Sequence, residues 1–176
     1  MVRDWLPRPL AGESVMLRCP EPGDEPALVE MATDARVREF IGGPADPAIA
    51  VQRAAQRIAT PAWGQFVIVQ SGTGVVVGSG DLARKRGPWE VSFQLRYAFW
   101  GRGYAYEAVS LIRDWFFAHT DGDLLIATTQ VANTRSRRLL QRLGAVRVDA
   151  FEQYGLRQAR FEFYRDASEQ GQAASR

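Results

Sequence analysis

The feature that most constrains this chain is a change of hydrophobic period within one short stretch. Residues 91–97 alternate apolar and polar side chains, which is the pattern of a half-buried strand. Apolar residues then recur at the spacing of an amphipathic helix, at Ala108, Leu111, Ile112, Trp115 and Phe116. The stretch between the two patterns, Trp100-Gly101-Arg102-Gly103, therefore joins a strand to a helix.

This strand–loop–helix connection is suited to binding an anion. The first N–H groups of a helix have no partner within it, and the helix dipole adds partial positive charge there. Gly101 and Gly103 let a ligand approach the backbone, and Arg102 adds a cation suited to phosphate. No Gly-Lys-Ser/Thr follows, and Tyr106 stands where a dinucleotide fingerprint has its third glycine. Taken alone, the loop is also compatible with an ordinary tight connection.

A second motif opens a later helical segment. It reads Asn133-Thr134-Arg135-Ser136, and the segment ends at Arg142-Leu143-Gly144. Together the two stretches resemble the GNAT superfamily of acyl-CoA-dependent N-acetyltransferases, in particular the branch that acetylates ribosomal-protein N-termini. Residues 100–105 resemble the family's pyrophosphate loop, Gln/Arg-x-x-Gly-x-Gly/Ala, with Trp100 in the first position. The second stretch resembles Asn-x-x-Ser and Lys/Arg-Leu-Gly-Phe, with Ala145 in place of Phe.

The predicted fold follows from the order of the patterns along the chain. The resemblance extends from about Val15 to Asp166, and we expect one domain over residues 1–166 and a disordered tail over 167–176. Strand patterns lie at residues 14–18, 66–69, 75–82, 91–97, 124–129, 146–151 and 160–164, with helical segments between them. This order predicts an α/β (α+β) fold, a mixed sheet of six to seven strands with helices on both faces. The resemblance implies that this is the GNAT fold.

Composition excludes several other classes of protein. With one cysteine and one histidine, the chain has no intrachain disulfide, and we expect no metal site. No apolar run reaches the length of a membrane span, and the N-terminus lacks a signal-peptide pattern, so we expect a cytoplasmic protein that does not bind membranes. A net charge of +2 does not require a nucleic-acid partner.

The resemblance implies that acetyl-CoA is the co-substrate and that no metal is needed. The pantetheine arm is expected along the strand at Gln94, Leu95, Arg96 and Tyr97. The pyrophosphate is expected at Trp100, Gly101, Arg102, Gly103, Tyr104 and Ala105. Asn133 is expected to contact pantetheine and is also a good helix N-cap. Arg138 is the residue predicted to reach the CoA phosphates, with Arg137 and Arg142 as alternatives on the same helix and solvated charges as the plainer interpretation.

Two residues are predicted to carry the chemistry. The resemblance places Ser136 near the thioester sulfur, where its hydroxyl would protonate the leaving thiolate; the alternative is an ordinary helix-surface serine. Glu90, at the start of the central strand, is the candidate general base, acting through water; the alternative is a strand-edge carboxylate.

The predicted function is direct transfer of an acetyl group from acetyl-CoA to a primary amine. A protein or peptide N-terminal α-amine is the first choice of acceptor. Small-molecule amines, including polyamines, aminoglycosides and other antibiotics, are the alternative, and the acceptor is expected to be selected by the loops at residues 34–64 and 152–160. A non-catalytic domain that binds acyl-CoA is a second alternative. A homodimer is compatible with this fold, although no interface is indicated.

Overall fold

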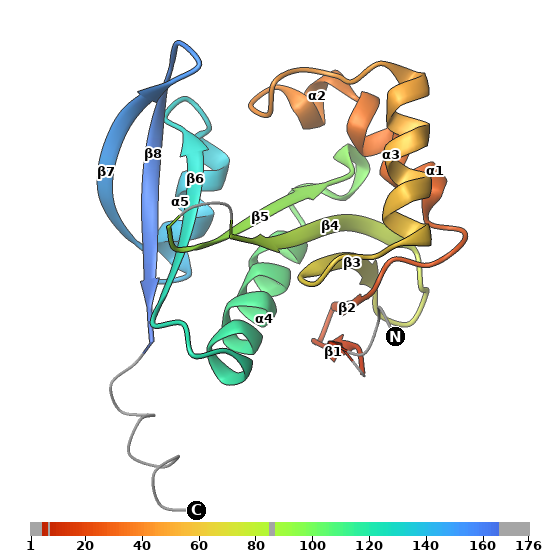
Figure 1. Ribbon diagram of the computed structural model, residues 1–176, viewed down its shortest axis with the longest axis horizontal. Coiled ribbons are helices and arrows are strands. Elements are labelled where there is room, and N and C mark those ends of the chain that lie inside the picture. Colours follow the sequence, from red (N-terminus) through yellow and green to blue (C-terminus); the bar gives the residue numbers. More distant parts are fainter. Residues whose placement is uncertain (1–4, 7, 85–86, 166–176) are drawn as a thin grey trace, which may run out of the picture.

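The computed structural model describes residues 5–6, 8–84 and 87–165, which form one eight-stranded sheet with five α-helices (Figure 1). The strand order is β1-β2-β3-β4-β5-β6-β8-β7. The strands are β1 Leu10–Ala11, β2 Val15–Arg18, β3 Gln65–Gln70, β4 Val76–Ala83, β5 Trp89–Leu95, β6 Leu124–Gln130, β7 Val146–Gln153 and β8 Leu156–Tyr164. The helices are α1 Glu25–Thr33, α2 Ala35–Arg38, α3 Pro47–Ala59, α4 Tyr104–His119 and α5 Thr134–Arg142.

The predicted mixed α/β architecture is confirmed, with more strands than the six to seven expected. The addition is β1, a two-residue strand in which Leu10 pairs with Leu17 and Ala11 with Met16. Its flank contains Pro9, which lacks an N–H, so the sequence carries no strand pattern there. The predicted tail, residues 167–176, lies outside the described residues.

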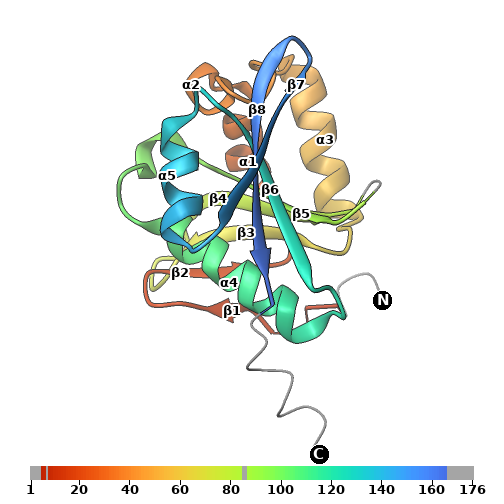
Figure 2. The ribbon, with the colours of Figure 1, turned by 90° about the vertical axis from the view of Figure 1, so that its left-hand side faces the viewer.

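Helices cover both faces of the sheet, as expected. Ile112 of α4 lies so close to Gly80 of β4 that a Cβ at Gly80 would come within 2.6 Å of its Cδ1. On the opposite face, Arg57 of α3 forms a 2.8 Å ion pair with Asp81 of β4. Consecutive strand residues point to opposite faces, so these two contacts distinguish the α4 face from the α3 face. Figure 2 shows α5 and α3 on opposite sides of strands β6 to β8.

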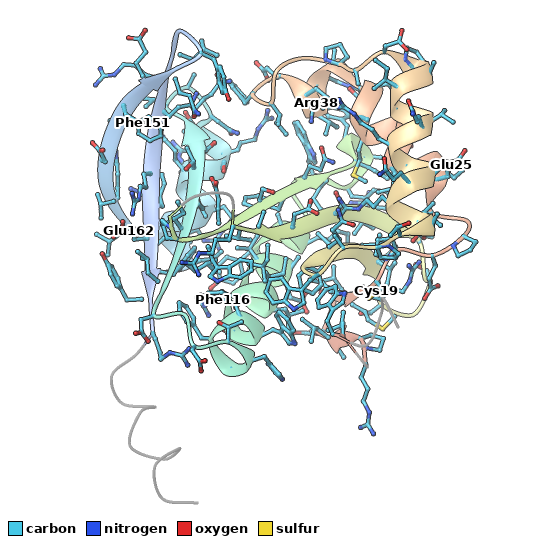
Figure 3. The ribbon with its side chains drawn as sticks, in the orientation of Figure 1. Cys19, Glu25, Arg38, Phe116, Phe151 and Glu162 are labelled. Carbon is cyan, nitrogen blue, oxygen red and sulfur yellow. The ribbon has the colours of Figure 1, made fainter. Side chains whose placement is uncertain are left out.

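The main apolar core lies between α4 and the sheet. The predicted stripe of α4 is buried at Ala108, Ile112, Trp115 and Phe116, and Phe116 is fully enclosed beneath the sheet (Figure 3). A second, smaller cluster joins α1, α2 and α3 through Leu28, Met31, Val37 and Ala54. None of the described helices has the length and apolarity needed to span a membrane.

Two local predictions need correction. Residues 97–99 form a 3₁₀ turn and do not continue the central strand, because Phe99 N–H donates to Arg96 O and closes the chain into a turn. Residues 152–160, expected to form a loop, are mostly paired in β7 and β8. A two-residue turn at Tyr154 and Gly155 makes this possible, because both residues adopt the positive φ that tight hairpins use.

The sheet leaves no room for a side chain at Gly78. A Cβ there would lie 2.5 Å from Gln94 O, a backbone atom that cannot move without breaking the β4–β5 pairing. At Gly80 the close atom at 2.6 Å is the end of the Ile112 side chain, which can rotate. We predict that Gly78→Ala lowers the free energy of unfolding by about 1–3 kcal/mol and that Gly80→Ala costs less. Denaturant unfolding of the two variants tests this, and equal losses would contradict it.

Candidate active site

The sheet divides between β5 and β6, the only parallel pair in the described part of the sheet. Trp89 pairs with Leu125 and Glu90 with Ile126, and the recorded pairing of the two strands stops there. Beyond this point β5 and β6 take diverging courses (Figure 1). The edges of the two strands that face each other are therefore open along the rest of their length.

The open edge of β5 presents unpaired backbone groups. Arg96 N–H donates to Val77 O at 2.9 Å, which places Arg96 in a hydrogen-bonded pair with β4. In an antiparallel ladder the alternate residues turn their N–H and C=O away from the partner strand. Leu95 and Phe93 therefore direct theirs into the gap. The indole of Trp100 donates to Leu95 O at 2.9 Å, which leaves the N–H groups of Phe93 and Leu95 on the open edge.

The loop after β5 brings a helix end to the same place. Gly101 and Gly103 have φ values of 77° and 82°, a left-handed conformation that glycine adopts without strain. Gly103 is the N-cap of α4, and Glu107 N–H is the first amide to donate back, to Gly103 O at 3.2 Å. The amide N–H groups of residues 104–106 therefore lie at the open end of the helix, where an anion is stabilised.

A cleft of about 430 Å³ lies beside this helix end and is called the outer cleft below. Its walls are the end of β5, the loop at Trp100, the first turn of α4, one side of α5, and α2 with the turn that follows it. Its cations are Arg36, Arg135, Arg138 and Arg142. None of the described residues that line it is Asp or Glu, so the cleft suits a polyanion.

Several of these arginines lie over aromatic rings. The Cζ of Arg135 is 4.2 Å from the centre of the Trp100 ring, and that of Arg142 is 5.1 Å from the Tyr106 ring. Arg36 lies over the Tyr97 ring at 3.9 Å and also pairs with Asp34 at 2.6 Å. The hydrogen bond from Arg36 lowers the pKa of the Asp34 carboxyl to about 2. These contacts hold the guanidinium groups near the cleft.

A smaller cavity of about 130 Å³, the inner pocket, opens between β5 and β6. The side chains that line it from the α3 face of the sheet are Ser92, Thr128 and Gln158. Ser92 is on this face because it pairs with Asp81, whose side chain contacts α3. The register of β5, β6 and β8 places Thr128 and Gln158 on the same face. Phe93 and Ser136 line it from the other face, which α4 and α5 cover. The inner pocket therefore passes through the gap in the sheet.

Ser136 lines both cavities, at the point where they meet. Its position follows from the start of α5. The side chain of Asn133 accepts a hydrogen bond from Ser136 N–H at 3.1 Å, which confirms Asn133 as the predicted N-cap. This cap fixes the first turn of α5 and so places Ser136 against the gap. Phe40 and Ile41, from the turn after α2, also line both cavities.

The structure brings together most of the residues predicted for acetyl-CoA and leaves some outside. Nine of the twelve line the cavities, together with the predicted catalytic residue Ser136: Gln94, Leu95, Trp100, Gly101, Gly103, Tyr104, Ala105, Asn133 and Arg138. Arg96 lies outside their lining, with its guanidinium paired to Glu30 at 2.7 Å. Tyr97 and Arg102 also lie outside the lining. Arg102 is exposed, with its Cζ 5.5 Å from the centre of the Phe99 ring.

Glu90 does not line either cavity. It lies half-buried in the last β5–β6 pair, and its side chain is on the same face as that of Ser92, two residues further along β5. Asp81 is also on this face, where burial raises the pKa of its carboxyl although the Arg57 guanidinium opposes the shift. Glu90 thus shares the α3 face with Ser92, which lines the inner pocket, but does not itself reach the lining.

Several lining residues were not predicted. Gln130 Nε2 donates to Phe40 O at 3.1 Å and so joins the end of β6 to the turn after α2. Thr128, Thr129 and Gln158 contribute neutral polar groups to the inner pocket. The one available signal was the change from apolar to polar side chains at the end of the strand pattern of residues 124–129. Gln158 gave no signal, because its role depends on the pairing of β8 with β6.

The described residues contain no group of three or more His, Cys, Asp or Glu side chains that could hold a metal ion. The single cysteine, Cys19, is buried.

The chain is similar to known acetyltransferases in both sequence and fold. The family model described as an acetyltransferase (GNAT) domain matches residues 14–146. A GNAT-family acetyltransferase from Bacillus anthracis superposes with a TM-score of 0.80 at 20% identity, covering 89% of this chain and 98% of that one. An acetyltransferase from Agrobacterium tumefaciens has a TM-score of 0.75 at 23% identity, covering 90% and 95%.

A third similar structure is a ribosomal-protein-S5-alanine acetyltransferase from Vibrio fischeri. It has a TM-score of 0.74 at 18% identity, and the match covers 91% of this chain and 98% of that one. At these identities the three structures show a shared fold.

Proposed function

The chain belongs to the GNAT acetyltransferase family, and on that premise we propose that it transfers the acetyl group of acetyl-CoA directly to an N-terminal α-amine of a protein or peptide. One observation carries the proposal: an arginine-lined outer cleft and an inner pocket through the sheet meet at Ser136. This arrangement allows the cofactor and the acceptor to approach from opposite faces.

The outer cleft fits the polyanionic part of acetyl-CoA. The N–H groups at the start of α4 and the left-handed glycines 101 and 103 provide a place for a pyrophosphate. Arg135, Arg138 and Arg142 provide cations for the remaining phosphate charge. The length of open β5 edge at Phe93 and Leu95 then provides N–H groups for the amide-containing pantetheine arm, as a neighbouring strand would be bound.

Acetyl-CoA supplies the acetyl group as a thioester. A new C–N bond to the amine replaces the C–S bond, the amine loses one proton and the thiolate gains one. Backbone N–H groups of the β5 edge stabilise the negative charge that develops on the carbonyl oxygen. Ser136 Oγ donates the proton to the sulfur. Glu90, on the α3 face, accepts the amine proton through water.

The charges of the residues that line the two cavities affect which class of amine the site accepts. Among the described residues, no Asp or Glu lines either cavity, and four arginines line the outer one. A polyamine or aminoglycoside carries several positive charges, and no carboxylate among the described residues that line the inner pocket would attract them. An α-amine has a pKa of about 8, so a useful fraction is neutral near pH 7 without a strong base nearby. The similarity to the Vibrio fischeri enzyme also supports this choice.

The acceptor is tested by following thiol release from acetyl-CoA with matched substrates. We predict turnover with peptides that have a free N-terminus and little or none with the same peptides blocked at the N-terminus. Polyamines and aminoglycosides are predicted to be poor acceptors because no carboxylate among the described lining residues attracts their positive charges. Faster turnover with a polyamine than with any peptide would favour the alternative, a small-molecule acetyltransferase. Binding of acetyl-CoA without turnover on any acceptor would favour a non-catalytic acyl-CoA-binding domain.

The role of Ser136 is tested by removing its hydroxyl. We predict that Ser136→Ala lowers kcat by about 10-fold or more, because the thiolate then leaves without a positioned acid. The dissociation constant for acetyl-CoA is expected to change little, since the backbone contacts remain. Thr134→Ala is the matched control, because Thr134 is an exposed residue two positions earlier in α5 and lies outside both linings. An unchanged kcat in Ser136→Ala would remove Ser136 from the mechanism.

A further inference from the structure

Trp100 joins the two parts of the site that would bind the two ends of the cofactor. It belongs to the loop that leads into α4, and its indole hydrogen-bonds the last residue of β5. We propose that Trp100 is a positioning residue, which holds the phosphate-binding loop at a fixed distance from the β5 edge. This inference rests on the proposed binding of acetyl-CoA in the outer cleft.

The hydrogen bond decides how Trp100 acts. Nε1 is the only donor of the indole, and it is used on Leu95 O at 2.9 Å. It is therefore not available to a phosphate, and the side chain carries no charge. The family motif has Gln or Arg at this position, whereas here the side chain acts on the protein's own backbone. We infer that Trp100 organises the cofactor site without being one of its anion ligands.

Packing fixes the ring as well as its N–H. Trp100 is the one residue in the described part of the chain that packs against both apolar clusters, the main core and the cluster of α1 to α3. The Tyr97 ring meets it edge-on at 5.0 Å, and the Cζ of Arg135 in α5 lies 4.2 Å from the centre of the Trp100 ring. Arg135 also lies 3.8 Å from Glu39, in the turn after α2. The ring thus contacts the elements that line the outer cleft from each side.

A fixed distance between loop and strand edge matters only to a ligand that bridges them. CoA has phosphates at one end and an amide-containing arm at the other. Once the phosphates bind the loop, the effective concentration of the arm at the β5 edge rises. A fragment that occupies the loop alone gains nothing from the link. Loss of the indole N–H should therefore weaken the complete ligand and leave the fragment unaffected.

The test compares CoA with 3′-phosphoadenosine 5′-diphosphate, which has the adenine, the 3′-phosphate and the pyrophosphate of CoA but no pantetheine arm. Calorimetric titration of Trp100→Phe is expected to show a dissociation constant for CoA raised roughly 3- to 10-fold, the effect of one lost hydrogen bond. The dissociation constant of the fragment is expected to stay within about twofold, since its contacts are unchanged. Trp63→Phe is the matched control, because its ring lies in an aromatic cluster with Trp5, Trp89 and Trp115 and outside the cleft.

Three outcomes of these titrations would overturn the inference. Unchanged CoA affinity in Trp100→Phe overturns the inference while the proposed function stands. Equal weakening of CoA and the fragment also overturns it, because Trp100 would then act on the phosphates or on the fold as a whole. Failure of the unmodified protein to bind CoA overturns the proposed function and, with it, this inference.

A second measurement needs no variant and covers the case in which Trp100→Phe does not fold. In the unmodified protein, the indole N–H of Trp100 is expected to exchange with solvent more slowly than an open indole, because it is held by Leu95 O. The protection should persist when CoA binds. Exchange at the rate of a free indole would show that the link to β5 is absent and would overturn the proposal.

Discussion

The separation of β5 from β6 beyond Glu90 is the constraint on which the rest of the site depends. Pairing at two positions holds the sheet together, and its loss after Ile126 exposes one edge of each strand. A sheet normally avoids open edges, so the gap must be filled by side chains or by a ligand. Here the open edge ends beside the start of α4, and α5 places Ser136 where the two cavities meet. A backbone feature thus decides where the two cavities meet.

Charge divides the site into two environments. Arginines lie on the outer side and neutral hydroxyls and amides line the inner pocket, whereas Glu90 and Asp81 lie on the α3 face beyond it. In the proposed function, a polyanion binds in the outer cleft and a neutral amine reacts from the α3 face. In the proposed function this division favours an α-amine over a polycation, because no Asp or Glu among the described residues lines the inner pocket.

Local patterns predicted much of the fold, because strand and helix periods and the Asn133 cap are properties of neighbouring residues. The sequence also indicated Ser136 and the glycine loop, which belong to short motifs. It did not indicate Gln158 or the turn at Phe40, because their place in the site depends on the pairing of β8 with β6 and on the contact with Gln130. Likewise, in the ladder with β4, Arg96 N–H donates to Val77 O, so the backbone N–H groups of Phe93 and Leu95 point into the gap. Single-strand patterns carry no information on which edge is free.

The most direct test of this account is amide hydrogen exchange of β5 with and without acetyl-CoA. If the pantetheine arm binds along the open edge, the N–H groups of Phe93 and Leu95 become protected when the cofactor binds. Arg96 N–H, already bonded to β4 at 2.9 Å, is expected to be slow in both states and serves as the internal reference. Unchanged exchange at Phe93 and Leu95 under saturating acetyl-CoA would contradict the account, because the gap would then not be where the cofactor binds.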